Sequence, residues 1–61
     1  MEKVTYINFK TGQIVTAQEF PHLQNRAVIR KGPGEEIVMK NIREAKKALQ
    51  LSGFVRSFLP F

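Results

Sequence analysis

The chain has 61 residues, with ten Lys or Arg against five Glu, a formal net charge of +5, a pI of about 10.1 and no cysteine. Disulfides and thiolate metal sites are excluded, and a single histidine excludes a multi-histidine metal site within one chain. A chain of this length buries only about 60% of its unfolded surface, so we expect a single domain, residues 1–61, with a marginal core. No apolar run reaches the ~18 residues of a membrane span and no apolar leader is visible, so we expect a cytoplasmic protein without a membrane partner.

Two strands are expected near the N-terminus, at residues 4–9 and 13–20, where β-branched and aromatic residues are frequent. The triplet at 10–12 (KTG) fits a three-residue turn with Gly12 in the left-handed conformation. A two-residue turn at 11–12 is the alternative, and it would shift the pairing by one residue.

The three-residue turn fixes which side chains face one another across this hairpin. It pairs Ile7 with Val15 and Thr5 with Ala17, and it places Tyr6 on the other face. Tyr6 could then add a stacking surface for bases beside exposed basic residues.

A connector is expected at residues 21–25, because Pro21 cannot donate to a sheet and Asn25 suits a turn. His22 in this connector has no orienting partner nearby, so we interpret it as a solvated side chain rather than a general base.

A second hairpin is expected from residues 26–31 and 35–40, centred on Pro33. One face of it is apolar and pairs Ile29 with Ile37 and Ala27 with Met39. The other face is mixed and pairs Arg30 with Glu36, Val28 with Val38, and Arg26 with Lys40. The opposite charges of Arg30 and Glu36 favour this register.

The loop of this hairpin, RKGPGEE at 30–36, resembles a phosphate cradle only superficially. A phosphate loop needs Gly-Lys-Ser/Thr at the start of a helix, whereas Lys31 precedes both glycines and a strand follows. Glu35 and Glu36 would also repel an anion. We therefore interpret the stretch as a hairpin turn.

A helix is expected over residues 42–52, with Asn41 as N-cap, Glu44 three residues later, and Gly53 as the stop. Its apolar face contains Ile42, Ala45, Ala48, Leu49 and Ser52. The opposite face contains Arg43, Lys46, Lys47 and Gln50, and Leu51 falls outside the apolar arc.

The last segment, residues 54–61, alternates as a short strand would, and Pro60 ends it. Its apolar residues are expected to help close the small core, or else to form an interface. The fold class that follows is α+β: an antiparallel sheet of two β-hairpins with one helix packed on one face. The C-terminal segment docks on the core or adds an edge strand.

Catalysis is not expected, because the chain has no Asp, no Cys and one His, and the adjacent Glu35 and Glu36 point to opposite faces of a strand. No cofactor or metal is expected. The excess of basic residues favours a module that binds nucleic acid mainly through backbone phosphates. The residues expected to contact phosphates are Arg43, Lys46, Lys47, Arg30, Lys40 and Arg26.

The alternative is a small protein-binding regulator or inhibitor, of the kind that mobile elements encode, with an acidic protein as partner. Its interface would comprise the sheet face and the Phe-rich tail, that is Phe58, Leu59, Phe61, Val28 and Val38. An open strand edge would also favour a symmetric homodimer.

Overall fold

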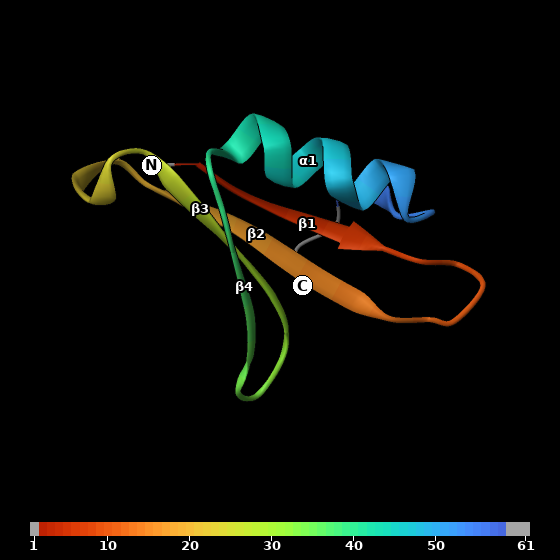
Figure 1. Ribbon diagram of the computed structural model, residues 1–61. Coiled ribbons are helices and arrows are strands. Elements are labelled where there is room, and N and C mark those ends of the chain that lie inside the picture. Colours follow the sequence, from red (N-terminus) through yellow and green to blue (C-terminus); the bar gives the residue numbers. More distant parts are fainter. Residues whose placement is uncertain (1, 59–61) are drawn as a thin grey trace.

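The computed structural model describes residues 2–58. Its elements are β1 (Lys3–Ile7), β2 (Ile14–Phe20), the 3₁₀ turn η1 (Pro21–Leu23), β3 (Arg26–Gly32), β4 (Glu35–Met39), α1 (Ile42–Leu51) and β5 (Val55–Ser57). The strands form one antiparallel sheet in the order β4-β3-β2-β1-β5, and α1 lies across one face of it (Figure 1). The expected α+β fold is confirmed, and the C-terminal segment does add an edge strand.

The first hairpin has a different register from the expected one. Tyr6 lies opposite Val15 and Val4 opposite Ala17, one residue away from the expected pairing. Ile7, which was expected to face Val15, instead faces Ile14. All side chains of β1 therefore point to the face opposite to the one expected.

The cause of this shift is a longer loop, residues 9–12, closed by the side chain and backbone of Asn8. The Asn8 N–H donates to the Gln13 carbonyl (2.9 Å), and the Gly12 N–H donates to the Asn8 carbonyl (2.7 Å). The Asn8 Oδ1 also accepts from the Lys10 N–H (2.9 Å). Gly12 has the expected left-handed backbone, with φ of 75°. Because the Asn8 side chain closes the loop, the loop contains four residues, one more than the position of Gly12 alone predicts.

The second hairpin has the expected register from Ala27/Met39 to Arg30/Glu36. Its turn is shorter than expected, since Gly32 pairs with Glu35 and a bulge at Lys31 absorbs the extra residue. The tip of this hairpin bends away from α1 (Figure 1), which leaves Ile37 40% exposed.

The helix begins and ends close to the expected residues. The Asn41 Oδ1 accepts from the Glu44 N–H (2.8 Å), as an N-cap should, and Gly53 has φ of 88° just beyond the C-cap Ser52. Ser52 was expected on the buried face, but it is exposed because the helix ends at Leu51.

The core lies between α1 and the sheet, and among residues 2–58 nine residues are buried in it: Val4, Tyr6, Val15, Ala17, Ala27, Ile29, Ala45, Leu49 and Phe54. Met39 and Ile42 pack against its margin. Ala17 and Ala27 on the strands and Ala45 on the helix let α1 lie close to the sheet, whereas Ala48 on the expected apolar face is only half-buried. Within residues 2–58, α1 is too short and too polar to cross a membrane.

Candidate binding surface

The face of the sheet opposite α1 is the largest candidate surface, and we call it the open face. No element of residues 2–58 lies over it in Figure 1. Because strand residues alternate between faces, the neighbours of the buried residues point towards it. Its aliphatic residues are Ile7, Ile14, Val28, Val38 and Val55, and its charged residues are Lys3, Arg26, Arg30 and Glu36.

The aliphatic residues of the open face form two groups. Val28 and Val38 face each other across β3 and β4, and Ile7 has both Ile14 and Val55 as cross-strand neighbours. Val38 is 62% exposed, Val55 46% and Ile14 41%. The solvent face of an antiparallel sheet is normally polar, so five aliphatic side chains make this face unusually apolar.

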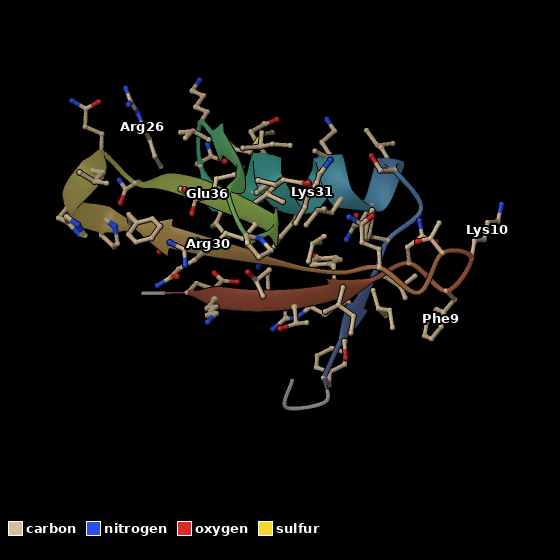
Figure 2. All side chains as sticks on the ribbon, turned by 90° about the horizontal axis from the view of Figure 1, so that it is seen from below. Phe9, Lys10, Arg26, Arg30, Lys31 and Glu36 are labelled. Carbon is tan, nitrogen blue, oxygen red and sulfur yellow. The ribbon has the colours of Figure 1, made fainter. Side chains whose placement is uncertain are left out.

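Three cations lie among these aliphatic residues. The Arg30 Nε donates to the Glu36 Oε2 at 2.6 Å, and Figure 2 shows the two side chains close together on the β3–β4 hairpin. Both are about half exposed, so the pair contributes little to stability. Lys3 and Arg26 form no ion pair within the described part of the chain.

Aromatic side chains are scarce on this face. The expectation that Tyr6 offers a stacking surface is wrong, because the true register buries Tyr6 in the core with 1% exposure. Phe20 is half-buried, and its ring meets the His22 ring edge-on, with centroids 6.0 Å apart. On the open face, therefore, a nucleic-acid base could stack only on the partly covered ring of Phe20.

The basic residues of α1 lie on the other side of the molecule. Arg43 and Lys47 are exposed, whereas Lys46 is ion-paired with Glu2, next to β1. The hydrogen bond from Lys46, together with the charges of Lys46 and Arg56, lowers the pKa of the Glu2 carboxyl. Lys46 thus already has a carboxylate partner.

The six residues expected to contact phosphates are therefore divided between two sides. Arg26 and Arg30 lie on the open face, the three basic residues of α1 lie behind it, and Lys40 is exposed in the link between β4 and α1. One flat ligand surface cannot contact both sets, because the sheet and the helix layer separate them.

The residues expected to form a protein interface are also spread out. Val28 and Val38 lie on β3 and β4, while Phe58 follows β5 at the opposite edge of the sheet. Phe58 is 85% exposed, and the guanidinium of Arg56 lies 5.1 Å from its ring centroid, a cation–π contact. Leu59 and Phe61 lie outside the described residues. Of the tail, Phe54 enters the core.

The connector forms a shallow depression lined by His22, Leu23, Gln24 and Arg26. None of these residues is a carboxylate that could orient the imidazole for general-base work. Among residues 2–58, no group of three or more His, Cys, Asp or Glu lies close enough to hold a metal ion.

Sequence reasoning missed Lys3, Ile7, Ile14 and Val55 as members of the open face. The signal was present in the alternation of the two N-terminal strands. Val4 and Tyr6 on one strand, and Val15 and Ala17 on the other, meet on one face only in the observed register. That choice would have turned Ile7 and Ile14 together towards the open face.

Comparisons of the chain with models of protein families, with curated proteins and with solved structures found no match.

Proposed function

We propose that this protein is a small non-catalytic module that binds an acidic protein through its open face and regulates that partner by covering part of its surface. The observation that supports the proposal is the aliphatic character of the open face, where Ile14, Val38 and Val55 are exposed beside the half-buried Ile7 and Val28. Covering apolar area of this kind contributes about 25 cal/mol per Å² removed from water.

The chemistry of these side chains favours a protein over a nucleic acid on this face. Proteins that bind single strands on a sheet stack bases on aromatic rings, and each stacked ring contributes about 1–3 kcal/mol. Val28, Val38 and Ile14 cannot stack in this way, but they pack well against other aliphatic side chains.

The charges of the open face favour an acidic partner. Lys3, Arg26 and Arg30 stand against the single carboxylate Glu36. Two copies of this chain placed face to face would bring like charges together, so the open face does not suit itself. Opposite charges on a partner would speed association and select against basic surfaces.

The test is a pull-down from the source cell with nuclease added, comparing the wild type with two charge-reversed variants. Lys3→Glu/Arg26→Glu changes the open face, and Arg43→Glu/Lys47→Glu, with the same change in net charge, is the matched control on the outer face of α1. The proposal expects a nuclease-resistant protein that the control still captures and the open-face variant loses. Its purified form should bind the wild type directly, more weakly as salt is raised.

If the Arg43→Glu/Lys47→Glu variant loses the captured protein and the open-face variant keeps it, the partner does not bind the open face. Binding that disappears with nuclease would overturn the protein partner. Circular dichroism of each variant verifies that the sheet and helix remain folded.

Nucleic-acid binding through backbone phosphates is the second candidate, and α1 gives it a specific basis. Arg43 and Lys47 are both exposed and lie one helical turn apart, four residues along the same face. A fluorescent oligonucleotide should then bind with an affinity that falls steeply with salt. Arg43→Ala/Lys47→Ala should weaken that binding, whereas Lys3→Ala should not. Absence of binding at low salt would exclude this candidate.

A further inference from the structure

The β4 edge of the sheet is unusually well suited to strand pairing. The strand order leaves β4 and β5 at the two edges, and β4 has five residues against three in β5. Proteins protect such edges with charged residues, proline or a bulge. Glu35 and Glu36 charge the first half of β4, but Ile37, Val38 and Met39 carry no charge or proline, and the bulge of this hairpin lies in β3. Ile37 and Val38 at this edge are 40% and 62% exposed.

We propose that a second copy of this chain pairs with β4, antiparallel, about a two-fold axis that passes beside Val38. A two-fold axis perpendicular to the sheet brings together side chains that point to the same face. The sequence numbers of two facing residues must therefore differ by an even number. With the axis at Val38, Val38 meets the partner's Val38, Ile37 meets the partner's Met39, and Glu36 meets the partner's Lys40.

Neighbouring registers are poorer. An axis at Ile37 places Glu36 opposite the partner's Val38, and an axis at Met39 places Val38 opposite the partner's Lys40. Only the axis at Val38 matches charge with charge and apolar with apolar at each position from Glu36 to Lys40. Symmetry forms the Glu36 to Lys40 pair twice in each dimer, and opposite charges at directly facing positions stabilise a sheet.

Lys40 lies at the end of this edge. The ladder between β3 and β4 ends at Met39, without the expected Arg26 to Lys40 pair, and the chain bends at Lys40 and Asn41. Lys40 is exposed at this bend, so its long side chain can reach the partner's Glu36 without displacing the helix, which begins at Ile42.

The small core gives the dimer a physical reason. Of the nine buried residues, three are alanine, and chains this short usually need additional stabilisation. Pairing at β4 would cover the outer flanks of Ile37 and Val38 and satisfy the free backbone groups of the edge. The inference concerns the sheet edge and does not depend on what the open face binds.

Analytical ultracentrifugation across a micromolar to submillimolar concentration series tests the pairing, with two single charge reversals and their combination. The wild type should sediment as a reversible dimer. Glu36→Lys and Lys40→Glu should each raise the dimer dissociation constant about tenfold or more, because each places like charges opposite one another twice. The double variant Glu36→Lys/Lys40→Glu should restore the wild-type value to within about threefold.

The double variant also controls for the Arg30 to Glu36 ion pair within one chain. That pair is lost in Glu36→Lys and in the double variant alike, so recovery of the dimer must come from the contact between copies. A second comparison uses the exposed valines at the two edges. Val38→Lys should abolish the dimer, and Val55→Lys on β5 should leave it intact.

A wild-type chain that stays monomeric at submillimolar concentration would overturn the proposal. A dimer that survives Val38→Lys but is lost in Val55→Lys would also overturn it, because the interface would then lie at β5. Failure of the double variant to recover, in a folded chain, would refute the register.

Discussion

The two faces of this sheet carry similar aliphatic residues in different surroundings. Val15 and Ile14 are adjacent on β2, yet Val15 is 1% exposed under the helix and Ile14 is 41% exposed on the open face. The covered face packs against Ala45 and Leu49 of α1, whereas the open face keeps its apolar area in water. In this chain one set of strands therefore supplies the core on one side and an uncovered, partly apolar face on the other.

The largest effect should come from the helix residue that seals the covered face. Leu49 is 3% exposed and Leu51, two residues later, is 79% exposed. Leu49→Ala should lower the free energy of unfolding by about 3 kcal/mol, because it leaves a cavity in a small core. Leu51→Ala should change it by less than about 0.5 kcal/mol. Urea unfolding followed by circular dichroism measures both, and equal costs would contradict the described packing of α1.

A matched pair on β2 tests the comparison of the faces most directly. Val15→Thr places a hydroxyl in the core and should cost about 2 kcal/mol of unfolding free energy. Ile14→Thr should cost less than about 1 kcal/mol, because its hydroxyl stays in water. The same denaturant titrations apply, and a larger cost for Ile14→Thr would mean that β2 turns its other face towards the helix.

The helix cap should have a smaller effect. Asn41→Ala removes the acceptor for the Glu44 N–H and should cost about 1 kcal/mol of unfolding free energy. Gln50→Ala, an exposed change within the same helix, is the control and should be nearly neutral. An unchanged melting temperature for Asn41→Ala would argue against the observed cap.

The smallest effect concerns pH and the Glu2 to Lys46 ion pair. The pKa of Glu2 is lowered in the folded chain, so its contribution to stability is present above the unfolded pKa and is lost as pH falls through the folded pKa. The melting temperature of the wild type should therefore fall slightly more than that of Glu2→Gln when the pH is lowered from neutral to acidic. The reverse order would contradict the ion pair.

The second hairpin was predictable because its signals are local and agree with one another. Pro33 and Gly34 mark the turn, and Arg30 and Glu36 match across it, so the register followed from the sequence. The helix was equally clear, since Asn41 and Gly53 mark its ends. Each of these features depends on contacts between residues close together in the chain.

The first hairpin shows where this reasoning failed. The triplet KTG suggested a three-residue loop, but the side chain of Asn8 closes a loop of four residues. Because a shift of one residue inverts a strand, Tyr6 moved from the surface to the core and Ile7 moved to the open face. The pairing of Lys46 with Glu2 was also unforeseen, because more than forty residues separate them in the sequence.

The pairing of β5 with β1 has a consequence for the order in which the sheet folds. The last strand of the described chain pairs with the first, with Arg56 opposite Tyr6, and Phe54 enters the core only when that pair forms. Every other strand and the helix precede β5 in the chain, so the pairing of β1 with β5 joins residues about fifty positions apart. Contacts this distant in sequence slow folding relative to a helical chain of equal length. Until β5 docks, the outer edge of β1 has no strand beside it and is open to strands of other chains.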